Sequence, residues 1–181
     1  SSSAASDVYK RQIDGVPFTA KEEFDIEGYR TTVGTQFLGQ TPTNTTATCV
    51  QRLCDAGAVL IGKTNMHEIG IGVTGFNPHH GTPRNPYNLN HHTGGSSSGA
   101  GAAVAAGLGP FAIGADGGGS IRIPAAFCGV AGLKPTFGRV SEFGAAPLCW
   151  SVAHIGPLGA TVDDVAIAYA LMAGADPLDP N

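Results

Sequence analysis

Two serines set among small residues are the side chains of this sequence best suited to nucleophilic chemistry. Ser96 follows two glycines, and Ser120, 24 positions later, follows three. Because glycine has no side chain, the N–H groups before Ser120 stay uncovered and can converge on the oxyanion of a reacting carbonyl. A serine nucleophile also needs a base. Lys21, 75 positions before Ser96, can serve as that base when it is neutral, a form that burial favours.

The segments around these residues resemble the amidase signature family. The resemblance is carried by short blocks spread over the chain: GVPFTAK at 15–21, TTVG at 31–34, GAVLIGKTN at 57–65, the stretch 94–125 that ends in SIRIPA, CGVAGLKPT at 128–136 and GPL at 156–158. Together these blocks extend the resemblance over most of the chain, from about Ile13 to Gly174.

The resemblance implies a Ser–Ser–Lys triad. Ser120 would attack an amide carbonyl and form an acyl-enzyme, while Ser96 would relay the proton between Ser120 and Lys21 and return it to the leaving amine. Water would then release the acid. Members of the family hold the relay serine after a non-proline cis peptide bond, which we predict between Gly95 and Ser96. The oxyanion would be bound by the backbone N–H groups of Gly117, Gly118, Gly119 and Ser120.

Three neighbouring side chains, Ser97, Asp116 and Arg122, are expected to support this site, with Asp116 and Arg122 bracing the serine loops. Ser97 also allows an alternative function. It is the centre of GSSSG at 95–99, which matches the nucleophile elbow of α/β-hydrolase esterases, and Asp116 and His154 follow in the order of their triad. The elbow requires a strand directly before the serine, whereas the residues before Ser97 are typical of a loop.

Two further patterns suggest ligands that we do not expect. GAVLIGKT at 57–64 matches the P-loop pattern for nucleotides, but its inner residues AVLI favour a strand over a phosphate-binding loop. The histidine pairs at 79–80 and 91–92 lack the spacing of metal ligands. We therefore expect neither a metal nor a cofactor.

The cysteines also show no zinc or disulfide spacing and are predicted to be small buried residues in a reducing compartment: Cys49, Cys54, Cys128 and Cys149.

Composition argues against a nucleic-acid-binding protein and against a membrane-spanning one. A chain of 181 residues can bury one sizeable core, and its net charge of −4 without any basic run argues against a nucleic-acid partner. The uncharged stretch 93–115 is mostly Gly, Ala and Ser, which is too weakly apolar for a membrane span. We expect an intracellular protein, and peripheral membrane contact and a homodimer stay open.

The two ends of the chain carry expectations of their own. Residues 1–12 (SSSAASDVYKRQ) have no periodicity and are predicted to be a non-native leader. The resembling family continues well beyond residue 181. We therefore expect residues 13–181 to be the N-terminal part of an amidase domain whose C-terminal part is missing.

Hydrophobic periodicity predicts an α/β fold. Helices are expected from Thr43 or Asn44 to about Ala56, over 98–106, and from Thr161 and Asp164 to about Ala173. Strands are expected over 58–61 and 111–115, with a long loop over 74–98. Alternating strands and helices indicate a largely buried sheet, and the resemblance implies a mixed sheet flanked by helices.

Two details bear on the substrate. Ile123 follows SIR, where the glutamine-using tRNA amidotransferase of the family has Gln, and the triple glycine before Ser120 resembles that of fatty acid amide hydrolases. The resemblance therefore favours a small-molecule amide with an acyl chain, such as an N-acylethanolamine. The alternative within the family is hydrolysis of the glutamine amide by a tRNA-dependent amidotransferase of the A type.

Overall fold

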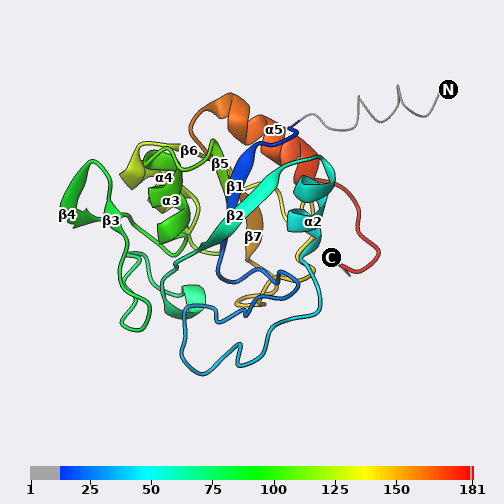
Figure 1. Cartoon of the computed structure of the whole chain (residues 1–181), viewed down its shortest axis with the longest axis horizontal. Coiled ribbons are helices and arrows are strands. Elements are labelled where there is room, and N and C mark those ends of the chain that lie inside the picture. Colours follow the sequence, from blue (N-terminus) through cyan, green and yellow to red (C-terminus); the bar gives the residue numbers. More distant parts are fainter. Residues whose placement is uncertain (1–12, 180) are drawn as a thin grey trace.

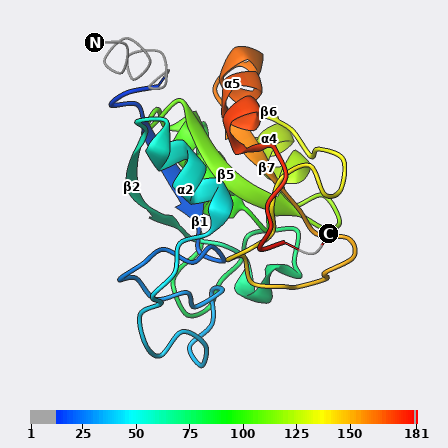
Figure 2. The same cartoon turned by 90° about the vertical axis from the view of Figure 1, so that its right-hand side faces the viewer.

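The computed structural model describes residues 13–179 and 181, so the predicted leader at 1–12 lies outside the described residues. A five-stranded sheet lies between two pairs of helices (Figures 1 and 2). Its strand order is β2-β1-β5-β7-β6. The strands are β1 (Pro17–Lys21), β2 (Val59–Thr64), β5 (Phe111–Asp116), β6 (Ala131–Gly132) and β7 (His154–Gly159). Strand β1 pairs in parallel with β2 and β5, whereas β7 runs antiparallel to β5 and β6, so the predicted mixed sheet is confirmed.

The helices cover both faces of the sheet, as the two views show (Figures 1 and 2). Helices α2 (Thr48–Asp55) and α5 (Val162–Met172) lie on one face, and α3 (Ser98–Ala105) and α4 (Arg122–Cys128) lie on the other. The strand period of two explains how β5 serves both layers. Ile113 and its alternate neighbours pack with α2 and α5, while Ala112 packs with α3 and α4. Both faces of β5 are therefore buried.

Several predicted elements are confirmed. Helix α3 and strand β5 agree with their predicted ranges to within one residue. Thr161 caps α5 through a capping box, because its hydroxyl accepts the Asp164 N–H and the Asp164 carboxylate accepts the Thr161 N–H. Strand β2 continues past the predicted 58–61 to Thr64, because it pairs with the full length of β1.

The predicted start of the first helix at Thr43 or Asn44 is wrong. Helix α2 begins at Thr48, and its N-cap Ala47 has no side-chain cap. The reason is a competing set of backbone bonds: the Thr43 N–H donates to the Tyr29 carbonyl, and the Ala47 N–H donates to the Asp25 carbonyl. These bonds hold residues 43–47 along the 25–29 segment, so the helix starts only after them.

The segment predicted as a loop over 74–98 contains a short hairpin. Its strands are β3 (Arg84–Asn85) and β4 (Asn88–His92), and a single 3₁₀ turn, η1 (Glu68–Gly70), precedes the segment. The hairpin is separate from the main sheet, and β4 is exposed along its whole length, so it carries no apolar alternation by which the sequence could reveal it.

Two further findings concern expectations from composition. No helix within the described part of the chain is long and apolar enough to cross a membrane. All four cysteines are free thiols, and Cys49 and Cys128 are buried as predicted. The prediction of burial is wrong for Cys54, which is half-buried, and for Cys149, which is exposed in an irregular loop.

Candidate active site

The candidate site forms at one edge of the sheet. Lys21 is the last residue of β1, and Asp116 is the last residue of β5. Because β1 and β5 are parallel neighbours, their carboxyl ends meet at the same edge, the usual place for a site in such a sheet. Residues 117–120 continue from β5 and place Ser120 there. The loop before α3 brings Ser96, and the Ser97 N–H donates to the Ser120 carbonyl at 3.2 Å, which ties the two serine loops together.

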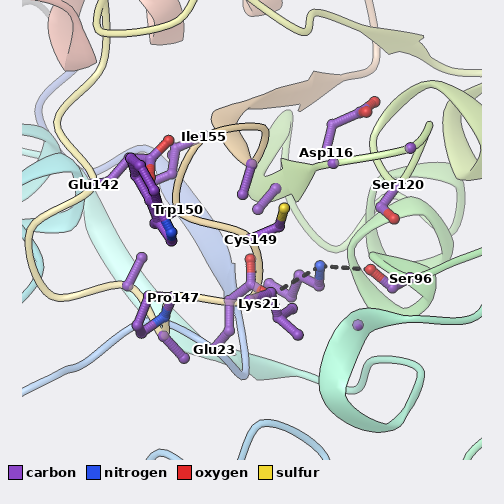
Figure 3. A pocket seen from close by; sticks show the side chains of 18 of the residues that line it. Lys21, Glu23, Ser96, Asp116, Ser120, Glu142, Pro147, Cys149, Trp150 and Ile155 are labelled. Atoms are coloured by element: carbon purple, nitrogen blue, oxygen red, sulfur yellow. Dashed lines mark hydrogen bonds and ion pairs between the residues drawn. The ribbon is translucent and has the colours of Figure 1, made fainter. Parts of the chain in front are cut away.

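The three residues of the predicted triad line one cavity of about 450 Å³ (Figure 3). Lys21 and Ser96 are each 1% exposed, and Ser120 is 8% exposed. The Lys21 Nζ donates a hydrogen bond to Ser96 Oγ at 2.8 Å. Figure 3 shows the Ser120 side chain pointing toward Ser96, on the side away from Lys21. The structure thus brings the three predicted side chains together, with Ser96 between Lys21 and Ser120.

Ser96 follows the predicted cis peptide bond to Gly95. Close packing surrounds this bond: a Cβ added at Gly95 would lie 2.5 Å from the backbone nitrogen of Gly75. The Ser96 carbonyl also accepts the N–H of His67. Glycine is therefore required at position 95, because a side chain there would push two backbone segments apart.

The glycine turn after β5 offers three free N–H groups rather than four. The N–H groups of Gly117, Gly118 and Ser120 make no hydrogen bond within the described residues, and a Cβ at Gly117 or Gly118 would meet nothing within 4 Å. The Gly119 N–H donates to Asp116 Oδ1 at 2.7 Å. The prediction that Gly119 also binds the oxyanion is therefore wrong for this structure, because the Asp116 carboxylate already occupies that donor.

Asp116 and Arg122 make the contacts expected of a brace. Arg122 Nε and Nη2 donate to the two Asp116 oxygens at 2.9 and 2.8 Å. The same carboxylate also accepts the N–H groups of Gly119, Ile121 and Arg122. Burial alone would raise the pKa of Asp116, but Arg122 and these N–H groups outweigh it and lower the pKa to about 2. The Asp116 carboxylate, kept ionised at neutral pH by these partners, thus fixes the turn that carries Ser120.

The geometry around Ser97 does not support the esterase alternative. Ser97 is fully buried, its Oγ donates to the Ala115 carbonyl at 3.2 Å, and it does not line the cavity. The His154 Nδ1 faces the Val152 carbonyl, and Asp116 is bound by Arg122. Ser97 therefore lacks a base and instead ties the loop before α3 to strand β5.

The remaining sequence patterns have structural explanations. Lys63 of the P-loop-like segment lies in β2, where its Nζ donates to the Arg30 carbonyl and pairs with Glu22. His79 pairs with Glu68. The described ranges contain no cluster of three or more His, Cys, Asp or Glu side chains that could hold a metal ion.

Glu23 lines the same cavity as the triad, although the sequence did not predict it as a site residue. Its Oε2 lies 3.1 Å from the Lys21 Nζ, and its side chain is 2% exposed. The available signal was its position two residues after Lys21, because an acidic residue so near in sequence can be brought against the lysine by the turn that ends the strand. Two consecutive glutamates after a strand are, however, equally typical of a solvated turn.

The walls of the cavity were not predicted either. Most of them are apolar and come from segments far from the serines: Ile71, Val73, Phe143, Leu148, Trp150, Ile155 and Leu178. Glu142, labelled in Figure 3, and Asp179 are half-buried carboxylates that line the same side. Burial, followed by the charges of Asp179 and Glu23, raises the pKa of Glu142 to about 7. The cavity thus combines an apolar wall with carboxylates near the lysine.

Comparison with known proteins now assigns the family. The family model described as Amidase matches residues 2–181. The chain belongs to the amidase family. Within this family it is 50% identical over 169 residues to AtzE, the 1-carboxybiuret hydrolase subunit of Pseudomonas sp. (strain ADP), covering 92% of the chain and 37% of that protein. It is 45% identical over 168 residues to a fatty acid amide hydrolase of Oryza sativa subsp. indica, covering 92% of the chain and 28% of that protein.

A solved amidase-family structure confirms the fold. The chain matches the crystal structure of the A-type subunit of glutamyl-tRNA(Gln) amidotransferase from Thermotoga maritima with a TM-score of 0.87 and 37% identity. The match covers 93% of the chain and 38% of that structure. The chain therefore spans well under half the length of these amidase-family relatives.

Proposed function

We propose that Lys21, Ser96 and Ser120 form the reactive centre of an amidase that cleaves a carboxylic amide through an acyl-enzyme on Ser120. The observation that carries the proposal is the 2.8 Å hydrogen bond between the Lys21 Nζ and Ser96 Oγ, made in a cavity that Ser120 also lines. The Lys21 side chain is 1% exposed, and its amine, when neutral, can take the proton of the Ser96 hydroxyl that it contacts. Membership of the amidase family supports the same chemistry.

The first half of the reaction forms the acyl-enzyme. The Ser120 Oγ attacks the amide carbonyl carbon as its proton passes to Ser96 Oγ, and the Ser96 proton passes to the neutral Lys21 Nζ. The carbonyl electrons move to the oxygen, where the free N–H groups of Gly117, Gly118 and Ser120 can stabilise the negative charge. When the tetrahedral intermediate collapses, the C–N bond breaks. The leaving nitrogen takes a proton from Ser96, which regains one from Lys21.

The second half of the reaction uses the same groups with water in place of Ser120. A water molecule loses a proton through Ser96 to Lys21 and attacks the acyl carbon. The ester bond to Ser120 then breaks, the acid leaves, and the proton returns to Ser120. Because this cycle needs only proton transfer and an oxyanion site, the residues in the cavity are sufficient for it.

For the substrate we propose a fatty acid amide. The apolar cavity wall around Ile71, Leu148 and Ile155 suits an acyl chain, and the similarity to the rice fatty acid amide hydrolase agrees with it. Hydrolysis of the glutamine amide is a second candidate, favoured by the similarity to the glutamyl-tRNA(Gln) amidotransferase structure. The ratio of kcat/KM for a long-chain amide, a short-chain amide and glutamine separates the two. Faster turnover of short amides than of long ones contradicts the acyl proposal.

Labelling with a fluorophosphonate tests the reaction itself. With the protein produced from its complete reading frame, mass spectrometry should find the label on Ser120, and Ser120→Ala should abolish it. Lys21→Ala should slow labelling by about 10²–10⁴, the contribution of a general base. Ser97→Ala should cause a far smaller loss because Ser97 does not line the cavity. Label on Ser97, or no label on the folded protein, contradicts the proposal.

A further inference from the structure

We infer that Glu23 is a positioning residue for the lysine base: it holds the Lys21 Nζ against Ser96 and balances the charge that Lys21 acquires when it takes up a proton. The inference rests on the proposed function and adds a fourth residue to its machinery. Glu23 does not reach the reacting atoms itself, because Lys21 lies between it and Ser96 (Figure 3).

The position of Glu23 follows from the end of strand β1. Lys21 is the last residue of the strand, and the Phe24 N–H donates to its carbonyl at 3.1 Å, which turns the chain sharply after it. The Glu23 carbonyl accepts the N–H of Ala146 at 2.9 Å, so the turn is fixed against the wall of the cavity. This turn places the Glu23 and Lys21 side chains in the same cavity.

The contact between the two side chains is an ion pair without a well-directed hydrogen bond. Glu23 Oε2 lies 3.1 Å from the Lys21 Nζ, yet this buried oxygen has no hydrogen-bond donor among the described residues. The Lys21 Nζ instead directs its hydrogen bond to Ser96 Oγ. Burying a carboxylate without a partner is strongly unfavourable, so Lys21 is the group that stabilises the buried Glu23 carboxylate.

This arrangement suits a base that becomes positively charged during the reaction. Each time Lys21 takes the proton from Ser96, an ammonium forms on a side chain that is 1% exposed. A carboxylate 3.1 Å away stabilises that ammonium. Glu23 thus favours the transfer of the proton from Ser96 to Lys21.

Other ionisable groups near the cavity are paired with other residues or come from the 142–179 segment. Glu22 accepts the Thr32 N–H and hydroxyl and pairs with Lys63. Asp116 is bound by Arg122. The remaining ionisable groups that line the cavity come from the 142–179 segment: Glu142, Cys149 and Asp179. Glu23 is the one acidic group for which the described residues show an ion pair with Lys21.

The test is the pH dependence of fluorophosphonate labelling in Glu23→Gln, with the protein from its complete reading frame. The amide keeps the shape of the side chain and removes its charge. Above the acid limb, the labelling rate should fall by about 10- to 100-fold, the effect of removing a partner that orients a reactive group. The acid limb itself should move to lower pH by about 1–3 units, because the protonated lysine loses an opposite charge.

Glu22→Gln is the matched control. It removes a neighbouring carboxylate that does not contact Lys21, so the acid limb should stay at its wild-type position. An acid limb that does not move in Glu23→Gln, or that moves equally in Glu22→Gln, overturns the inference. Thermal unfolding of each variant shows that the labelled protein is folded.

Glu23→Asp provides a second test should the glutamine variant not fold. The aspartate keeps the charge on a shorter side chain, so the acid limb should stay near the wild-type pH while the rate falls. A rate equal to that of the wild type overturns the positioning role. A failure of the proposed function is distinguishable, because the wild-type protein itself would then not label at Ser120.

Discussion

At the scale of single residues, Asp116 is the side chain on which the Ser120 turn depends. Its buried carboxylate binds Arg122 and three N–H groups of that turn. Asp116→Asn should lower the free energy of unfolding by about 3 kcal/mol, the lower end for a broken buried ion pair, because the partner Arg122 is 54% exposed and can regain water. Urea unfolding measures the loss. Asp163→Asn, on an exposed carboxylate in the first turn of α5, should cost less than about 1 kcal/mol.

The loss of unfolding free energy in Asp116→Asn should depend on pH. The pKa of Asp116 in the folded protein is lowered from 3.8 to about 2, so its contribution to stability is complete above pH 4. As the pH falls from about 4 to 2, the unfolded chain binds a proton before the folded protein does, and the contribution disappears. The difference in unfolding free energy between wild type and Asp116→Asn should therefore shrink over this range. A difference that stays constant down to pH 2 contradicts the assignment of the lowered pKa.

At the scale of secondary-structure elements, the start of α5 shows that a local sequence signal can determine where a helix begins. Thr161 and Asp164 form a capping box at the start of α5, whose buried face packs on the sheet. Thr161→Ala should cost about 1 kcal/mol, the usual value for a lost N-cap, when measured by thermal or urea unfolding. Thr161→Ser retains the hydroxyl and should stay close to the wild type. An equal loss in both variants would show that the methyl group, not the cap, is responsible.

At the scale of the whole molecule, Arg52 joins the two helices of one layer to the chain that follows them. From α2 its guanidinium donates to the carbonyls of Met172, Gly174 and Ala175. The residues that follow in the chain, Leu178 and Asp179, line the cavity. Arg52→Ala should destabilise the protein by about 1.5–3 kcal/mol, as expected for lost bonds from a charged donor.

Hydrogen exchange locates this effect. Amides of residues 174–179 should exchange faster in Arg52→Ala, because their carbonyl anchors are gone. Gln51→Ala is the matched control, since Gln51 lies on the same helix but, among the described residues, its side chain bonds only to Asp55, one turn away. Faster exchange in both variants would mean that α2 itself, rather than the Arg52 contacts, holds the segment.

The sequence by itself determined the reactive residue types and the elements with strong local signals. Glycine turns, the capping box at Thr161 and the apolar run of β5 are set by neighbouring residues, so a local pattern reveals them. The residues of the proposed triad could also be selected from the sequence, because Lys21, Ser96 and Ser120 lie in motifs that resemble a known family. The start of α2 could not be predicted from the local sequence, because backbone hydrogen bonds to residues 25–29 determine it.

Only the tertiary structure decided how these residues meet. The parallel pairing of β1 with β5 brings Lys21 and the Ser120 turn to one edge, and residues 75 positions apart then share a hydrogen bond. Asp116 takes the Gly119 N–H, and Glu23 is buried beside Lys21. Burial and pairing are properties of segments distant in sequence. The burial of Glu23 and the hydrogen bond of Gly119 therefore could not be predicted from the polarity of Glu23 or the flexibility of Gly119.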